Sequence, residues 1–264
     1  MEFAEGPDKF FISSAREPIS FFLDLNNKGT FPSQDPEEQA LFGQGKIFLS
    51  GFDPSILDIG HSSELSNLSL LGKSSFNVEG GADIIEISGT INADNLHGDK
   101  YNPTILATLC YPYATKASPI VCIDPSPFDK QNKVCEIKDV ELESQGAPIA
   151  VTKIEEDASG RRVRFNINIK NVGGGEVISF ASLGKCDPSE RLRTDDFDFV
   201  ELKSAKIGTV DLLDNCGPFA KGSKGVSNLI RLFNGEGSVA CTLDISKLGK
   251  VDSAFITPLS IELR

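Results

Sequence analysis

Apolar and polar residues alternate in two similar stretches of this chain. Residues 21–26 place Phe or Leu at every second position, and residues 165–170 place Phe or Ile in the same way. A period of two with one apolar face predicts a half-buried β-strand. The chain has 24 glycines and 14 prolines, which interrupt it at short intervals as turns do in β-sandwiches. The pattern therefore predicts an all-β protein.

Three local signals add detail to this prediction. The dipeptide Asn234-Gly235 is typical of a tight turn between two strands. Residues 35–42 favour a helix of one or two turns, because a proline and two acidic residues would occupy its first turn. Residues 227–233 favour a second short helix.

The alternating stretches belong to an internal repeat. Residues 21–29 match residues 165–173, and both stretches end in Asn-x-Gly, which suits a turn. Three further matches follow in the same order: 47–55 with 181–189, 81–87 with 235–241, and 101–109 with 255–263. The offset between the two copies is 165 − 21 = 144 residues in the first match and 181 − 47 = 134 in the second. Copy one therefore has more residues between these two segments, which predicts an insertion at residues 32–38. The repeat predicts a duplicated module.

We therefore expect two tandem β-sandwich modules, at residues 8–123 and 144–264, joined by a cysteine-containing connector at 124–143. In copy one the last strand continues and returns through residues 120–123, whereas copy two stops at Arg264. We expect its final strand to be truncated. No export signal opens the chain. Together these features predict an ectodomain excised from a longer protein.

The composition of the chain limits the kinds of partner that it could bind. The net charge of −12 disfavours nucleic acid and an anionic membrane surface, since both require a basic face. The 18 Phe, 3 Tyr and absence of Trp count against an aromatic sugar-binding face. No apolar run is long enough to cross a bilayer, so we expect membrane attachment only through a segment absent from this chain.

Six cysteines are scattered along the chain, and no two have the spacing of a zinc or thioredoxin motif. They are Cys110, Cys122, Cys135, Cys186, Cys216 and Cys241. Their even number predicts three disulfides and an extracellular or cell-surface location, with six buried thiols as the alternative. Cys122 with Cys135 is the first predicted pair, because these residues flank a short loop, and Cys186 with Cys216 is the second.

We find no nucleophile elbow, phosphate-binding loop or dinucleotide motif, and predict no enzyme, catalytic residue, cofactor or metal. The two histidines, His61 and His97, lie in loop-like sequence. The acidic runs 155–157 and 195–198 could serve glycoside hydrolysis or Ca²⁺ binding, but fit a solvated strand edge or turn better. The triplet that begins at Asn67 is a candidate glycosylation acceptor.

The strand ending in Asn-x-Gly, at residues 25–29 and 169–173, resembles the CARDB type of immunoglobulin-like module. Residues 50–54, 108–111, 145–151 and 185–188 resemble a group of uncharacterised archaeal cell-envelope proteins. The resemblance implies an adhesive or spacer role at a cell surface. It carries over no catalytic residue, and the cysteines depart from the ordinary CARDB pattern.

The sequence thus predicts a non-enzymatic structural or adhesive protein of a cell envelope or extracellular assembly, with an unknown protein or envelope partner. Self-association is expected through edge strands, which offer unpaired backbone groups. The alternatives are a glycan- or Ca²⁺-binding surface module, a filament or virion subunit, and a hydrolase that uses loop carboxylates.

Overall fold

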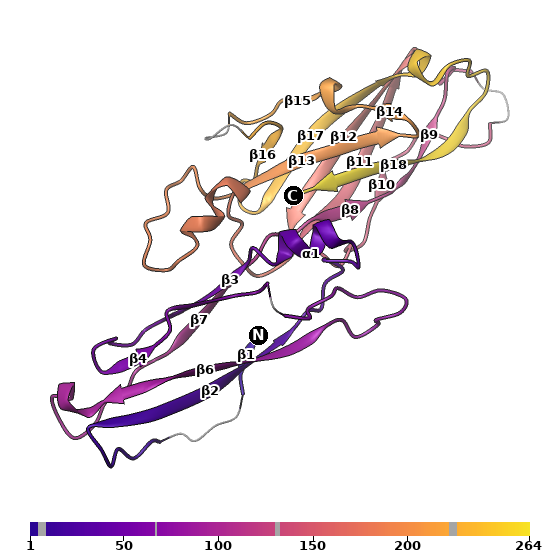
Figure 1. The fold of residues 1–264 in the computed structure, drawn as a ribbon. Helices are drawn as coiled ribbons and strands as arrows, with labels where there is room; N and C mark the ends of the chain where they lie inside the picture. Colours follow the sequence, from indigo (N-terminus) through magenta and orange to yellow (C-terminus); the bar gives the residue numbers. More distant parts are fainter. Residues whose placement is uncertain (5–8, 67, 130–132, 222–225) are drawn as a thin grey trace. The chain divides into compact units, whose positions relative to one another are not determined.

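The computed structural model describes residues 1–4, 9–66, 68–129, 133–221 and 226–264. It consists mostly of β-strands in several sheets with few helices, which confirms the all-β prediction (Figure 1). The chain divides into two compact units. Unit 1 comprises Met1–Pro112 and Leu183–Arg191, and unit 2 comprises Tyr113–Ser182 and Leu192–Arg264.

Unit 1 contains two sheets. The four-stranded sheet has the order β1 (Glu2–Phe3), β2 (Arg16–Asn26), β6 (Ala82–Asn92) and β4 (Leu57–Ile59). The three-stranded sheet has the order β5 (Ser62–Glu64), β3 (Lys46–Ser50) and β7 (Leu106–Cys110). A short helix, α1 (Pro36–Phe42), lies between β2 and β3 in sequence, and a 3-10 turn (Ala93–Asn95) follows β6.

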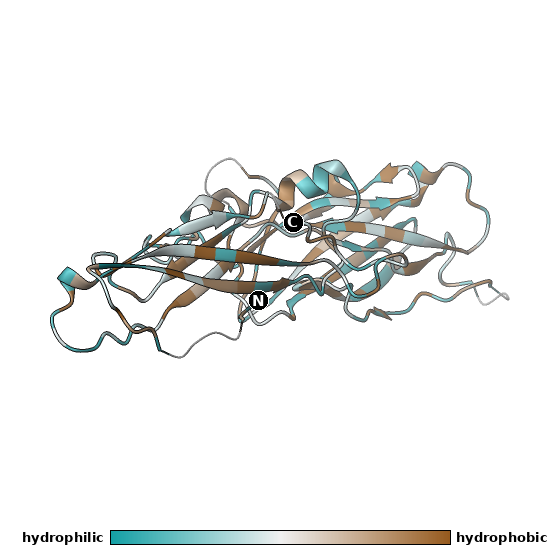
Figure 2. Cartoon of the chain, turned by 60° about the horizontal axis from the view of Figure 1, so that its bottom comes forward, coloured by the Kyte–Doolittle hydropathy of each residue, from teal (hydrophilic) through white to brown (hydrophobic). Residues whose placement is uncertain are grey.

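The core of unit 1 follows from the alternation along its strands, which Figure 2 shows as alternating bands of colour. On β2, Leu23 and Leu25 are buried, and on β6 Ile87 and Ile91 face the same side. The second sheet buries Ile47 of β3. The connections add an aromatic cluster, in which Phe42 contacts Phe31 and Tyr111.

Unit 2 also contains two sheets. The first has the order β10 (Val140–Glu141), β11 (Ile149–Ser159), β12 (Arg162–Asn171), β17 (Glu236–Asp244) and β15 (Cys216–Gly217). The second has the order β14 (Val210–Asp211), β13 (Phe199–Ile207), β18 (Phe255–Leu263) and β8 (Thr115–Ala117). In addition, β16 (Leu229–Arg231) pairs with β13, and β9 (Ile120–Ile123) pairs with β18. Short 3-10 segments cover Leu213–Asn215 and Ile245–Leu248, and a third, Phe180–Lys185, begins in unit 2 and ends in the Leu183–Arg191 segment of unit 1. One apolar core lies between these sheets, so unit 2 is a β-sandwich.

The internal repeat is visible in the hydrogen bonds of both units. Asn27 N–H donates to Gly81 O (2.8 Å), and Asn171 N–H donates to Gly235 O (2.7 Å). Each asparagine also accepts from the glycine two residues later through its Oδ1, at 3.0 Å in unit 1 and 3.1 Å in unit 2. The first and third sequence matches therefore occupy equivalent places at the β2–β6 and β12–β17 pairs.

The second sequence match is wrong. Residues 181–189, which were matched to β3, form a 3-10 helix and a turn, whereas β3 pairs with β7 as β13 pairs with β18. The shared Asp-Pro-Ser forms the same turn in both places, with the serine N–H and hydroxyl donating to the aspartate Oδ1. Turn chemistry alone produced the match. The predicted insertion at residues 32–38 is wrong too, because the longer connection is the one from β12 to β13.

The local predictions were mostly confirmed. Helix α1 spans Pro36–Phe42, and the Asp35 side chain caps it by accepting from Glu37 N–H (2.8 Å). Asn234 and Gly235 form the predicted turn, both with positive φ. The helix predicted at residues 227–233 is wrong, because Leu229, Ile230 and Leu232 are buried where the chain forms β16 on β13.

The two units also differ from the predicted module boundaries. The first module was expected to end at residue 123, but β8 and β9 pair with β18 and belong to unit 2. Leu183–Arg191 belongs to unit 1, although residues of unit 2 flank it on both sides. The connector 124–143 includes β10, which pairs with β11.

All six cysteines form disulfides. Cys122 is bonded to Cys135, as predicted. Cys186 is bonded to Cys110, so its predicted bond to Cys216 is wrong, and Cys216 is instead bonded to Cys241 opposite it on β17. Three disulfides indicate an oxidising, extracellular-type environment.

Among the residues described, no helix has the length and apolar character needed to cross a membrane.

Candidate functional site

The strongest candidate site is the outer face of the β2–β6 pair in unit 1. Phe22 of β2 is 43% exposed and Ile84 of β6 is 62% exposed. The register pairs Phe22 with Glu86 and Ile84 with Asp24, so the two apolar side chains lie diagonally on the same face. Large apolar side chains grouped on a sheet face that otherwise meets solvent indicate a contact surface.

Four carboxylates lie on the same face as this apolar pair, three of them next to it and one farther along β6. Glu2 of β1 lies opposite Asp24, Glu86 lies opposite Phe22, and Asp58 of β4 lies opposite Thr90 on the far side of β6. None of the four carboxylates forms an ion pair or side-chain hydrogen bond with a residue that the structure describes. Like charges placed directly opposite each other, as in Glu2 and Asp24, repel.

The positions equivalent to these in unit 2 are neutral or paired. Phe22 and Ile84 correspond to Asn166 and Ser238, which are opposite Ala240 and Asn168 on the β12–β17 pair. Charged residues near these positions are joined to one another. Lys170 contacts Glu236 (2.7 Å), and Lys153 contacts Asp139 (2.7 Å) and Glu155 (3.4 Å).

We call the unit 1 surface the acidic–apolar face. Its members are Phe22, Ile84, Glu2, Asp24, Glu86 and Asp58. Sequence reasoning missed this face, because the strand was assigned from its buried side alone. Phe22 was the available signal, since it is a large apolar residue at a position where the alternation calls for a polar one.

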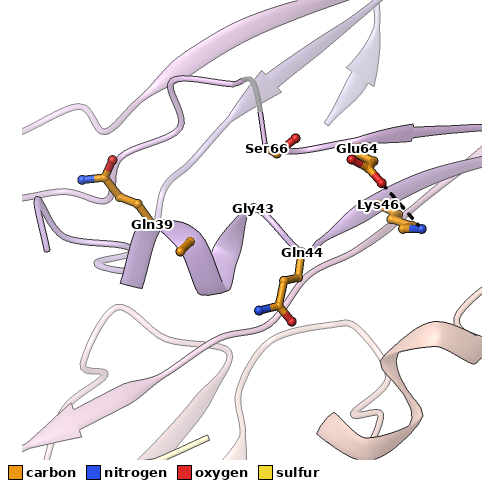
Figure 3. A pocket seen from close by; sticks show the side chains of 7 residues that line it. Gln39, Gly43, Gln44, Lys46, Glu64 and Ser66 are labelled. Atoms are coloured by element: carbon orange, nitrogen blue, oxygen red, sulfur yellow. Dashed lines mark ion pairs between the residues drawn. The ribbon is translucent and has the colours of Figure 1, made fainter. Parts of the chain in front are cut away.

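A shallow hollow of about 550 Å³ lies beside α1 in unit 1. It is lined by Gln39, Ala40, Gly43, Gln44, Lys46, Glu64 and Ser66. Figure 3 shows that the Gln39 and Gln44 amides point in different directions, while the Lys46–Glu64 ion pair (3.9 Å) lies at the other end. The polar groups therefore do not converge on one ligand atom.

The acidic runs are dispersed by the fold. Asp196 is buried, where its carboxylate accepts from the Ser182 hydroxyl (2.5 Å) and from Arg193 N–H (2.9 Å), while Asp195 is exposed. Asp198 has a positive φ of 61° and is half-buried. Asp196 thus organises its own loop and does not form a carboxylate pair with its neighbours.

Glu156 is buried, although the acidic run 155–157 was expected to face solvent. It points into unit 2 and is 8% exposed, with its Oε2 accepting from Cys122 N–H (3.2 Å). Its Oε1 is buried without a hydrogen-bond partner among the described residues. Burial raises the pKa of the Glu156 carboxyl to about 7, and the Cys122 N–H only partly opposes this. The alternation of inward and outward side chains along β11 would have predicted this burial, because Glu156 lies two residues after Ile154 and therefore on the same inner face.

The remaining candidates lie in loops. His61 and His97 are exposed. The pKa of Asp53 is lowered, mainly by the Ser55 hydroxyl, and that of Asp187 by the Ser189 hydroxyl, with weaker contributions from the nearby histidines. Within the described ranges, no group of three or more His, Cys, Asp or Glu side chains could hold a metal ion. The glycosylation candidate Asn67 lies outside the described residues.

No protein-family model, no curated protein and no solved structure matches this chain. The resemblance to CARDB-type modules therefore stays a prediction.

Proposed function

We propose that this protein is a non-enzymatic structural or adhesive protein of a cell surface or extracellular assembly, built from two immunoglobulin-like modules. Its acidic–apolar face would bind a basic partner protein that also offers apolar side chains. The observation that carries this proposal is the contrast between two equivalent sets of positions. In unit 2 these positions are neutral or joined in ion pairs, whereas in unit 1 no described residue pairs with the carboxylates.

The disulfides support the extracellular part of the proposal. All six cysteines are used as cross-links, which persist in oxidising compartments. The equivalent hydrogen bonds at Asn27 and Asn171 support the tandem arrangement, since each module would use the same turn to fix the same strand pair.

The charge on the face favours a cationic partner. Lys or Arg side chains placed over the opposed Glu2 and Asp24 would relieve their mutual repulsion, while Phe22 and Ile84 would be covered by apolar groups. Charged rims mainly set specificity and association rate, whereas buried aromatic residues supply most of the affinity. Phe22 should therefore dominate the binding energy.

The test uses a synthetic peptide of alternating lysine and leucine as a model of a basic, apolar strand surface. Surface plasmon resonance should show binding that weakens as salt rises. Replacing the pair by its unit 2 counterparts, Phe22→Asn with Ile84→Ser, should weaken binding at least tenfold. The matched control carries the substitutions Asn166→Ser and Ser238→Ala in unit 2 and should bind as the unmodified protein does.

A peptide in which glutamate replaces lysine should not bind. The proposal fails if the Phe22 and Ile84 variant binds unchanged, or if the unit 2 variant loses as much affinity.

A further inference from the structure

Strand β7 of unit 1 has a neighbour on only one side. It pairs with β3, and no described residue pairs with its other edge. Its equivalent in unit 2 is β18, which pairs with β13 on one side and with β8 and β9 on the other. The fourth sequence match, 101–109 with 255–263, fixes this equivalence.

The inward residues of β7 are less buried than the equivalent residues of β18. Leu259, Ile261 and Leu263 of β18 face the core and are 0%, 2% and 1% exposed. The equivalent residues of unit 1, Ile105, Ala107 and Leu109, are only half-buried. Residues 101–105 also lie outside any strand, whereas residues 255–259 are held in β18 by β9.

The open edge offers hydrogen-bonding groups. Leu49 N–H donates to His61 O, away from β7, so the opposed residues Leu49 and Ala107 form a pair without mutual hydrogen bonds. The N–H and C=O groups of Ala107 and Leu109 therefore point away from β3. In unit 2 the corresponding residues, Ile261 and Leu263, lie opposite Ala117 and Thr115 of β8. Leu259, at the next position of the same parity, donates its N–H to Pro119 O (2.9 Å).

We propose that the open edge of β7 is a strand-acceptor site, to which a partner polypeptide adds one antiparallel strand. Unit 2 shows the chemistry of such a strand. Ala117, Val121 and Ile123 of β8 and β9 are buried against the core, while Lys116 and Ile120, which precede Ala117 and Val121, are exposed. The partner strand should likewise place small or branched apolar residues at its inward positions.

The disulfide at the end of β7 does not block this edge. Cys110 shares a face of the strand with Thr108 and Leu106, opposite to the inward residues Ala107 and Leu109. The site also uses a different surface from the acidic–apolar face, so the two proposals can fail independently.

The probe is a fluorescent peptide of residues 113–124 with Cys122→Ser, which copies the strand that completes unit 2. When the full chain is titrated into the labelled peptide, the fluorescence anisotropy of the peptide should rise and saturate. Hydrogen exchange should slow at residues 101–110 while residues 255–263 remain unchanged. A peptide N-methylated at the positions of Thr115 and Ala117, which lie opposite Leu263 and Ile261 in unit 2, and a scrambled peptide of the same composition should each bind at least tenfold more weakly.

The matched protein variant is Ala107→Pro, which removes an N–H that β3 does not use and which an edge strand tolerates. It should keep its melting temperature and lose at least tenfold in peptide affinity. In the absence of peptide, a dimer that this variant converts to monomer would identify a second copy as the partner.

The proposal is overturned if the peptide does not bind, if the N-methylated peptide binds as well, or if protection appears at β18 and not at β7. Equal binding by Ala107→Pro would also overturn it.

Discussion

The β2–β6 pair of unit 1 and the β12–β17 pair of unit 2 share their turns and register but not their surroundings. Phe165 and Val239 are fully buried in unit 2, whereas their equivalents in unit 1, Phe21 and Ile85, are half-buried. Unit 2 covers its pair with a six-stranded sheet, and unit 1 covers its own with three strands. Local sequence therefore fixes how a pair of strands forms, and the number of strands packed above decides how well it is buried.

The outer faces of the two strand pairs differ in the side chains they expose. In unit 2 the positions equivalent to Phe22, Ile84, Asp24 and Glu86 hold amides and small residues, with the ion pairs of Lys170 and Lys153 beside them. In unit 1 the same positions hold Phe22, Ile84 and carboxylates that form no ion pair with any residue the structure describes. The two strand pairs thus share one scaffold, while the outer face of the unit 1 pair holds exposed apolar side chains and carboxylates that the described residues do not pair.

The largest effect should come from truncating the equivalent core phenylalanines. Phe165→Ala should lower the free energy of unfolding of unit 2 by about 3–5 kcal/mol, because a fully buried ring is replaced by a cavity. Phe21→Ala should cost unit 1 about 1–2 kcal/mol, since Phe21 is half-buried and its ring contacts the exposed Phe3.

Hydrogen exchange across a urea gradient, followed peptide by peptide, measures each unit separately. Equal losses in the two units would show that their cores are covered to the same extent.

A pH-dependent effect should be confined to unit 2. The folded state raises the pKa of Glu156 to about 7 from the ordinary value of 4.5, so it binds more protons than the unfolded state between these values. Its contribution to stability is thus present below about pH 4.5 and is lost as pH rises toward 7. Glu156→Gln should raise the stability of unit 2 by about 1–3 kcal/mol at pH 8 and by little at pH 4.

Urea denaturation at several pH values, followed by hydrogen exchange in each unit, checks this prediction. The exposed neighbour provides the control: Asp157→Asn removes a carboxyl from the same strand but leaves Glu156 in place, so the loss of stability toward pH 7 should persist. A gain that is the same at pH 4 and pH 8 would contradict the assignment.

The smallest effect should distinguish the two repeated turns. Both asparagine side chains donate to a carbonyl four residues later, but Asn27 also donates to Leu70 O (2.7 Å). Asn171→Ala should cost about 1 kcal/mol, and Asn27→Ala about 1 kcal/mol more, because an additional carbonyl loses its donor. Urea denaturation with the same peptide-level readout tests the difference, and a larger loss at Asn171 would reverse the comparison.

The features that sequence predicted are those decided by neighbouring residues. The Asn-x-Gly turns, the Asp35 cap of α1, the Asn234-Gly235 turn and the Cys122–Cys135 bond all involve groups close in sequence. In each case the residue type supplies the required hydrogen bond, backbone conformation or short loop. The alternation of apolar and polar residues also predicted strands β2 and β12, because it too is a pattern among neighbouring residues.

The features that sequence did not reveal depend on contacts between distant segments. The bond from Cys110 to Cys186 joins residues 76 positions apart, and no local pattern favours it over other pairings. The pairing of β8 and β9 with β18 depends on where a strand of unit 2 is left uncovered. The acidic–apolar face required the register of β1, β2 and β6 before its residues could be placed together.

The Cys110–Cys186 bond also sets how this protein would carry tension. If the chain were pulled from points before residue 110 and after residue 186, the force would pass through the disulfide and bypass every residue between them. Strands β11 and β12 lie in that bypassed segment. At roughly 3.5 Å per extended residue, the bond withholds about 270 Å of chain from stretching. The oxidised protein would therefore be a shorter and less extensible tether than its reduced form.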